Sequence, residues 1–199
     1  QFKYLDSESI PFSFKDTQVP VTLDEAQQNH FRTRDILMVH GLIDGEHFAF
    51  YVAHLPSRIG GKGADLRSLG GEIMRKHSEK MSQKYPGIKI VVMGDMNDDP
   101  HDDSMAKWLG AVRDIEAVPE GGFFNPFWEM HANGYGSLAY RDVWSIYDQV
   151  IPSETLVNAQ KGTLKLQKIG RKGYYGVVFK KPFMVTQKGQ YKNYPFRTF

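Results

Sequence analysis

The chain has 199 residues, of which 41% are hydrophobic and 13% aromatic. This is enough to bury a sizeable core, and we expect residues 1–199 to form a single domain. The absence of cysteine excludes disulfides, zinc-thiolate sites and thiol nucleophiles. No apolar run approaches the ~20 residues of a membrane-spanning helix. The compartment stays open between the cytoplasm and export, and the sequence leaves the oligomeric state open.

The net charge of +2 hides an uneven distribution of charge along the chain. Residues 155–199 hold ten of the 25 basic residues and none of the 23 acidic residues. Aromatic residues such as Tyr174 and Phe179 alternate with these charges, as in segments that follow a phosphate backbone and stack on bases. The interpretation we favour is simpler: residues 161–170 and 174–182 are strands with a solvated basic face. With either interpretation, an all-basic segment attracts anionic substrates.

The first strong pattern along the chain is a β-hairpin. Residues 36–42 and 47–52 are apolar runs joined at Asp44-Gly45, a dipeptide that favours the positive φ values of a tight two-residue turn. The second run ends in a polar cluster at His54. A lone histidine at a strand end is usually structural, so His54 gains functional weight only if other strand ends carry polar residues as well.

A long helix is predicted over residues 64–84. Its Gly70-Gly71 pair weakens it by up to ~1 kcal/mol per glycine, so we expect irregular first turns. A second, short helix is predicted over residues 104–109. The helix pattern places one apolar stripe against the core, formed by Leu66, Leu69, Ile73, His77 and Met81.

The stretch from residue 88 to residue 100 is the most informative in the chain. Its apolar run predicts a buried strand that ends at Gly94 and then presents Asp95 and Asn97. Open α/β sheets place their ligand sites at such strand ends. Because the two polar residues are two apart, they would project from the same side of an extended segment. A carboxylate beside an amide suits phosphoester chemistry, although these residue types are also common in turns.

Two loops are predicted after this strand. The first carries four acidic residues that could be mistaken for a metal site, but we expect a solvated loop with helix caps. Residues 119–139 are predicted to form a long loop with aromatic plugs. The acidic residues of the first loop are Asp98, Asp99, Asp102 and Asp103.

A third polar strand end is predicted at Asp148. This acid interrupts an apolar set, and an acid in such surroundings needs a partner. Three segments then stand in order along the chain: HLPSR at His54, GDMND at Asp95 and YDQVIPS at Asp148. Together with TRDILMV at Arg34 they resemble the endonuclease/exonuclease/phosphatase superfamily, which includes deoxyribonuclease I, apurinic endonucleases, inositol polyphosphate phosphatases and neutral sphingomyelinases.

The resemblance implies an α/β (α+β) fold similar to deoxyribonuclease I: a four-layer sandwich of two mostly antiparallel sheets flanked by helices, with the site at one edge. It also implies a phosphoester hydrolase, either a nuclease or a phosphatase or phosphodiesterase. Water would attack phosphorus directly, with Mg²⁺ or Mn²⁺ as cofactor. The implied partner is a phosphate-ester substrate, nucleic acid among the options.

The resemblance also implies a role for each matched residue. His54 would bind the scissile phosphate and assist protonation of the leaving group. Asp95 would orient the attacking water beside the metal and bind that metal. Asn97 would hold the phosphate or the nucleophile, and Asp148 would orient a second histidine.

Arg34 and Arg58 stand where the family pattern often places positive charge near phosphate, although an arginine at a strand edge is commonly solvated. The family's opening strands, which carry an asparagine and the metal-ligand glutamate, and its closing Ser-Asp-His strand have no counterpart in this sequence. We therefore expect the parent protein to extend beyond Gln1 and Phe199, and the 199 residues alone to be inactive. Two alternatives stay open: a non-catalytic anion-binding or structural module with the same fold, and a lipid or inositol phosphate phosphatase instead of a nuclease.

Overall fold

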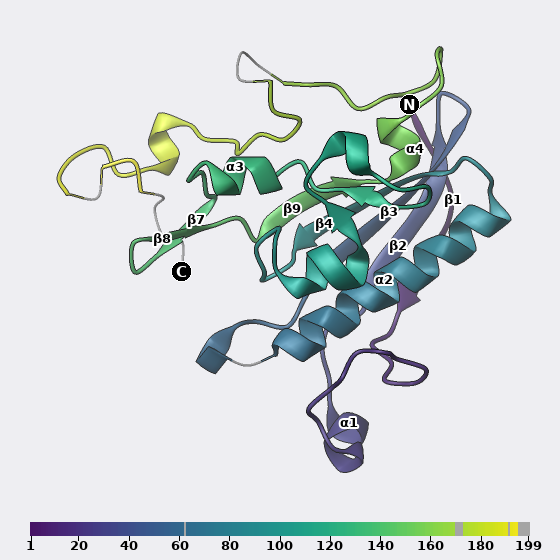
Figure 1. Ribbon diagram of the computed structural model, residues 1–199, viewed down its shortest axis with the longest axis horizontal. Helices are drawn as coiled ribbons and strands as arrows, with labels where there is room; N and C mark the ends of the chain where they lie inside the picture. The colour runs from purple at the N-terminus through teal and green to yellow at the C-terminus, as the bar shows by residue number, and fades with distance from the viewer. Residues whose placement is uncertain (62, 170–172, 191, 195–199) are drawn as a thin grey trace.

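The computed structural model describes the chain except for residues 62, 170–172, 191 and 195–199 (Figure 1). Its centre is a five-stranded sheet with the strand order β1-β2-β3-β4-β9. Within this sheet β3 and β4 run parallel, and the other neighbouring pairs are antiparallel. The strands are β1 (Phe2–Ile10), β2 (Ile36–Ile43), β3 (Glu46–His54), β4 (Lys89–Asp95) and β9 (Asp148–Pro152).

The predicted hairpin is confirmed as β2 and β3. Asp44 and Gly45 join the strands with φ values of 51° and 86°, so both turn residues adopt the positive φ that the dipeptide favours. β3 extends beyond the predicted strand and reaches His54. The apolar residues alternate along both strands, which gives the sheet one buried face and one more open face.

The long helix is confirmed as α2 (Ala64–Lys84), and it covers the buried face of the sheet (Figure 1). The irregular first turns expected at Gly70-Gly71 are not found, because the helix is continuous there. These glycines have a packing role instead. A Cβ atom at Gly71 would lie 2.2 Å from the backbone oxygen of Ser104, in the short helix η2 (Ser104–Leu109) that crosses α2.

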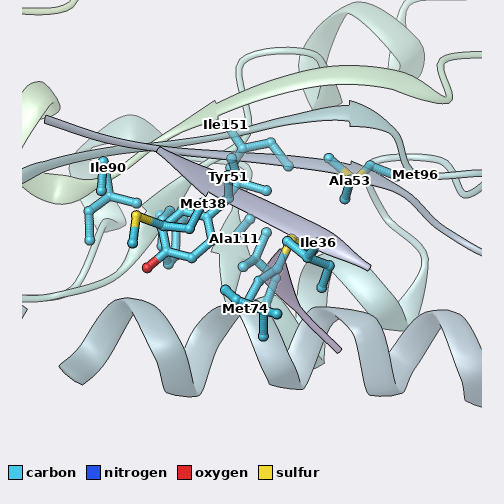
Figure 2. Packing of buried hydrophobic residues seen from close by; sticks show 14 of the residues in the cluster. Ile36, Met38, Tyr51, Ala53, Met74, Ile90, Met96, Ala111 and Ile151 are labelled. Atoms are coloured by element: carbon cyan, nitrogen blue, oxygen red, sulfur yellow. The ribbon is translucent and has the colours of Figure 1, made fainter. Parts of the chain in front are cut away.

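The core lies between α2 and the sheet (Figure 2). Side chains from all five strands form one cluster there with Met74 of the helix. On the opposite face Leu37, Val52 and Val150 remain exposed. The largest group of core residues includes Ile36, Met38, Tyr51, Ala53, Met74, Ile90, Met96 and Ile151.

The remaining elements are short and pack around the main sheet. Residues 119–139 contain two strand segments and a helix, so the predicted long loop is corrected, although its aromatic residues Phe123, Phe124 and Phe127 are indeed buried. β5 pairs with β6 and β7 with β8 in two small sheets. The elements are α1 (Glu25–His30), η1 (Ile59–Gly61), β5 (Ala111–Val112), η3 (Ile115–Ala117), β6 (Phe123–Phe124), α3 (Trp128–Ala132), β7 (Leu138–Tyr140), β8 (Val143–Ser145), α4 (Glu154–Val157) and η4 (Pro182–Met184).

The two strands predicted in the basic segment are not formed in its described residues. No neighbouring strand is available to pair with residues 161–169, and their backbone finds other partners. Leu164 N donates to Glu46 Oε1 at 2.9 Å, and Leu166 N donates to Leu156 O at 3.0 Å. The α/β class with several sheets is nevertheless the predicted one. Among the described helices, none combines the length and apolar character needed to cross a membrane.

Candidate functional site

Three strand ends meet at one edge of the main sheet. In the strand register His54 of β3 pairs with Asp95 of β4, and Asp95 pairs with Asp148 of β9. Their neighbours Ala53 and Gln149 are buried, so the three side chains lie on the opposite, open face of the sheet. Register alone therefore places one imidazole and two carboxylates in a row. We call these three residues together with Asn97 the polar edge.

The imidazole and the first carboxylate are close enough to interact and open enough to bind a ligand. His54 Nε2 lies 3.7 Å from Asp95 Oδ2, and the two side chains are 45% and 36% exposed. Asp148 is exposed at the first position of β9, whereas the sequence predicted apolar surroundings for it. Partial loss of solvent, and then the negative charge of Asp95, raise the pKa of Asp148, while His54 lowers it.

Gly94 allows β4 to approach β3 directly before Asp95. Its φ is 131°, and a Cβ atom at this position would lie 1.9 Å from the backbone oxygen of Ala53. Any side chain here would push the strands apart. The glycine therefore fixes the spacing between His54 and Asp95.

Asn97 reaches the polar edge by a turn. β4 ends at Asp95, and Asn97 has a φ of 51°. The prediction that Asp95 and Asn97 lie in one extended segment is therefore wrong. Asparagine tolerates this left-handed conformation better than most residues. Asn97 N donates to Asp95 Oδ1 at 2.9 Å, and Asn97 Nδ2 donates to the backbone oxygen of Leu55 at 2.9 Å. These two bonds fix the amide beside the carboxylate.

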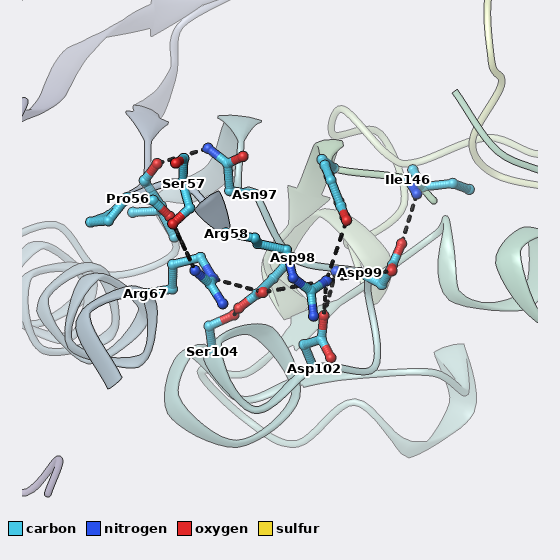
Figure 3. Close-up of polar contacts among 12 residues, drawn as sticks. Pro56, Ser57, Arg58, Arg67, Asn97, Asp98, Asp99, Asp102, Ser104 and Ile146 are labelled. Atoms are coloured by element: carbon cyan, nitrogen blue, oxygen red, sulfur yellow. Dashed lines mark hydrogen bonds and ion pairs between the residues drawn. The ribbon is translucent and has the colours of Figure 1, made fainter. Parts of the chain in front are cut away.

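The two arginines differ in how firmly they are held. Arg58 Nη1 lies 3.2 Å from Asp102 Oδ2, and its guanidinium carbon lies 5.6 Å from the centre of the Tyr147 ring (Figure 3). Burial acts to lower the pKa of Arg58, but Asp102, Tyr147 and Asp98 together outweigh it and raise that pKa. Arg34 is exposed and precedes β2, at the same end of the sheet as the polar edge. It makes no ion pair with the described residues.

Two carboxylates of the acidic loop, Asp98 and Asp99, are buried and not solvated as predicted, whereas Asp103 is exposed. Asp98 is 3% exposed, and its Oδ1 lies 2.7 Å from Nε of Arg67, which is also 3% exposed (Figure 3). Ser104 Oγ donates to Asp98 Oδ2 at 2.6 Å. Burial raises the pKa of Asp98, and the bond from Ser104 and the charge of Arg67 oppose that rise. The loop is thus fixed to α2 by a buried ion pair.

Further buried polar groups connect this loop to β9. Asp99 Oδ1 accepts a hydrogen bond from Ile146 N at 2.8 Å. Gln149 Nε2 donates to the backbone oxygens of Asp98 at 2.8 Å and Ile146 at 3.0 Å, and its Oε1 accepts from Asn125 Nδ2 at 2.7 Å. Sequence reasoning missed Gln149 and Asn125, and it expected Asp99 to be solvated. Strand alternation gave one signal for Gln149: it lies two positions before the apolar Ile151, so both side chains are on the inward face of β9.

A cavity of about 400 Å³ lies beside this network. Arg58 and Asp98 contribute to its wall together with His101 and Trp108, but no residue of the polar edge lines it. Its lining includes four carboxylates, so its charge is mixed and it has no clear preference for anions. The polar edge is therefore the better candidate for phosphate chemistry.

Comparisons with known proteins agree with this fold. The sequence model of the Endonuclease/Exonuclease/phosphatase family matches residues 11–199. The human Nocturnin catalytic domain with bound sulfate anion is similar in structure, with a TM-score of 0.52, 16% identity, and coverage of 77% of this chain and 48% of that chain. Truncated Caenorhabditis elegans TDP2 gives a TM-score of 0.51, 15% identity, and coverage of 78% and 55%. The chain thus spans about half the length of these solved chains. No curated protein sequence matches it.

Proposed function

Because the chain belongs to the endonuclease/exonuclease/phosphatase family, we propose that it carries part of the active site of a phosphoester hydrolase, with the reacting phosphate at the polar edge. One observation carries this proposal. The register of β3, β4 and β9 aligns an imidazole and two carboxylates, side by side and open to solvent, on adjacent strands. Acid-base groups within reach of one bound phosphate are what direct hydrolysis by water requires.

In this proposal each group of the polar edge has a task that its surroundings permit. His54 is exposed enough to contact a phosphate and donates a proton to the leaving oxygen, with Asp95 Oδ2 lying 3.7 Å from its Nε2. Asp95 orients the attacking water. Asn97 uses its amide group to hold the phosphate or the water in place. Asp148 pairs with Asp95 in the strand register and would orient a second histidine.

The polar edge suits a hard divalent cation, Mg²⁺ or Mn²⁺. Asp95 is the residue we expect to hold the ion, with oxygen atoms of Asn97 or Asp148 as further ligands. A cation there would relieve the repulsion between the neighbouring carboxylates of Asp95 and Asp148. When bound, the ion would neutralise charge on the phosphoryl oxygens. Arg58 and Arg34 are the candidate cationic side chains on the substrate side.

The alternative, a non-catalytic module that binds anions, also has an observation in its favour. In the part of the chain that the structure describes, no three His, Asp or Glu side chains are grouped to hold a metal ion. Turnover separates the two functions. A binding module retains phosphate-containing ligands in the presence of a chelator and releases no product when Mg²⁺ is added.

The experiment is an assay of the full-length protein on DNA, an inositol polyphosphate and a choline phospholipid, with and without Mg²⁺. His54→Ala should lower kcat by ~10² or more on whichever substrate is cleaved, because general acid catalysis contributes that much. The matched control is His30→Ala, which removes an exposed imidazole at the end of α1 and should leave kcat unchanged.

Asp95→Asn keeps the shape of the side chain and removes its charge, so a comparable loss is expected. Added Mg²⁺ restores part of the activity if the lost property is metal binding, and none if it is orientation of water. Unchanged kcat in folded His54→Ala protein would contradict the proposed role of the polar edge.

A further inference from the structure

A cavity of about 450 Å³ lies away from the polar edge, between α3, β8 and the basic segment. Figure 1 shows this segment beside α3, β7 and β8. The volume is in the range of sites that hold a small ligand or one unit of a larger one. Aromatic and aliphatic side chains dominate the lining, which includes Met130, Tyr135, Trp144, Tyr174, Val178 and Lys180.

The aromatic walls of this cavity are held in place. A Cβ atom at Gly136 would lie 2.9 Å from the Trp144 ring, so the glycine lets the chain pack directly against the indole. Tyr194 covers Trp144 from another side, with ring centres 5.1 Å apart. Tyr135 and Tyr174 meet edge to face at 6.0 Å. Rings positioned before binding lose little entropy when a flat group enters between them.

The lining of the cavity is cationic, which favours an anionic ligand. Lys180 contributes to the lining, and none of the lining residues is acidic. Other cations lie over aromatic rings in the same region: Arg141 over Tyr140 at 5.3 Å and Lys181 over Phe179 at 5.5 Å. Aromatic surfaces alternating with cations are the pattern that binds single-stranded nucleic acid, where bases stack and phosphates pair with cations.

The short chain segment between Trp144 and Asp148 limits how far the cavity lies from the polar edge. Trp144 is four residues before Asp148, so their Cα atoms are at most about 14 Å apart. The backbone oxygen of Trp144 lies 3.1 Å from Nε2 of His131, which in turn lies 3.4 Å from Oδ1 of the buried Asp99. A substrate with its phosphate at the polar edge therefore has the cavity within reach of a neighbouring unit.

We propose that this cavity binds a nucleobase of a single-stranded nucleic acid whose phosphodiester is cleaved at the polar edge. This inference rests on the proposed function and names its substrate class. An inositol polyphosphate has no flat apolar group to fill an aromatic cavity, and an acyl chain needs neither fixed rings nor a lysine. A base linked to phosphate matches both the rings and the charge.

The first test measures binding of a labelled oligonucleotide of roughly eight nucleotides to the full-length protein in EDTA. The comparison ligand has the same backbone with abasic residues. The base-containing ligand should bind about 10-fold more tightly, and Tyr174→Ala should remove most of that difference, because stacking on one aromatic ring has this magnitude. Tyr174→Phe keeps the ring and should keep the preference.

Two further variants separate a loss of base binding from a loss of folding or of an unrelated aromatic ring. Tyr135→Ala should reduce the preference if Tyr174→Ala fails to fold, since both rings line the cavity. Phe183→Ala removes an exposed aromatic ring of the basic segment that does not line the cavity, and the preference should remain. Equal affinity for the two ligands would overturn the proposal. Preferential binding of phosphatidylcholine vesicles, lost in Tyr174→Ala, would overturn it in favour of a lipid.

Turnover distinguishes this proposal from the proposed function. Mg²⁺-dependent cleavage of both ligands with equal KM would support the proposed hydrolase and contradict the proposed base site. Base-dependent binding without any cleavage would support the base site and contradict the proposed hydrolase. The combined result that we expect is cleavage of both, with a KM about 10-fold lower for the base-containing strand that Tyr174→Ala raises to the abasic value.

Discussion

The polar edge and the aromatic cavity are built from different kinds of structure. The polar edge stands on three strands paired along their length, and its loop is fixed by the buried ion pair of Asp98 with Arg67. The walls of the cavity come from α3, the short strand β8, and the basic segment, whose described residues form no strand. Groups that move protons need distances fixed to fractions of an ångström, whereas stacking on a base tolerates adjustment. We therefore expect substitutions under the polar edge to cost far more stability than those at the cavity.

The largest effect is expected at Gly94. Gly94→Ala should reduce the free energy of unfolding by roughly 4 kcal/mol or more, because the new Cβ atom meets the backbone of Ala53 in the centre of the sheet. Denaturant unfolding measures the loss. Gly87→Ala is the control, since Gly87 has a φ of 79° but open space around it, and about 1 kcal/mol is expected. Equal losses in the two variants would show that β3 and β4 can separate here at little cost.

The next effect is expected from breaking the buried ion pair. Arg67→Met removes the nearer of the two guanidinium groups around the buried Asp98, at 2.7 Å, and leaves Arg58 at 3.7 Å, so it should cost about 3 kcal/mol. Arg75→Met, on the same helix, removes a surface pair with Glu79 and should cost under about 1 kcal/mol. The urea midpoints of unfolding of the two variants, compared at a common m-value, measure both losses. A small loss in Arg67→Met would mean that the loop after Asp95 is fixed by other contacts.

A smaller, pH-dependent effect is expected at Glu72, on α2 and away from both regions. Burial acts to raise the pKa of Glu72, but hydrogen bonds from Lys76, Thr17 and the backbone of Gln18 outweigh it and lower the pKa. Glu72→Gln should cost about 2 kcal/mol at pH 7.

The sign of the pH dependence follows from the lowered pKa. Ionised Glu72 adds stability that is complete above about pH 5 and is lost as the pH falls below about 4.3 toward the folded-state pKa. The difference between wild type and Glu72→Gln should therefore shrink on acidification. Glu79→Gln, an exposed carboxylate of the same helix, should show a much smaller difference at pH 7. A difference at Glu72 that stays constant from pH 7 to pH 3 would disprove this account.

The smallest effect is expected at the rim of the cavity. Val177 lines the cavity but is 58% exposed, so Val177→Ser should change the free energy of unfolding by less than about 0.5 kcal/mol. Val92→Ala, inside the sheet below the polar edge, should cost about 2 kcal/mol. Thermal melts of both variants test the contrast. If Val177→Ser proved as costly as Val92→Ala, the cavity would be part of the main core.

The parts of the fold that depend on local pattern could be predicted from the sequence. The turn at Asp44-Gly45 and α2 follow from residue types within a few positions of one another. The buried acidic loop could not be predicted in the same way, because its partner Arg67 is 31 positions away from Asp98 and lies on the face of α2 opened by two glycines.

Two other differences between the predicted and the observed structure also arise from contacts that are distant in sequence or from backbone geometry. The strands predicted in the basic segment need a neighbouring strand that the described chain does not offer them, so their apolar and basic alternation was misleading. Asn97 was placed beside Asp95 by an argument from extended backbone, whereas a turn and two hydrogen bonds bring it there. Spacing predicted which residues are near one another, but not the geometry that brings them together.

The side chain of Gln149 has a consequence for how the molecule opens. Its amide bonds to the loop at Asp98, to the segment at Ile146 and to Asn125, and it is fully buried. If any one of these three segments detached, the others would keep a buried polar group without a partner, at a cost of about 1–3 kcal/mol. The three segments should thus open as one cooperative unit, and their backbone amides should exchange with solvent deuterium at a common free energy. Fluctuations that loosen the loop below the polar edge would then also loosen the start of β9.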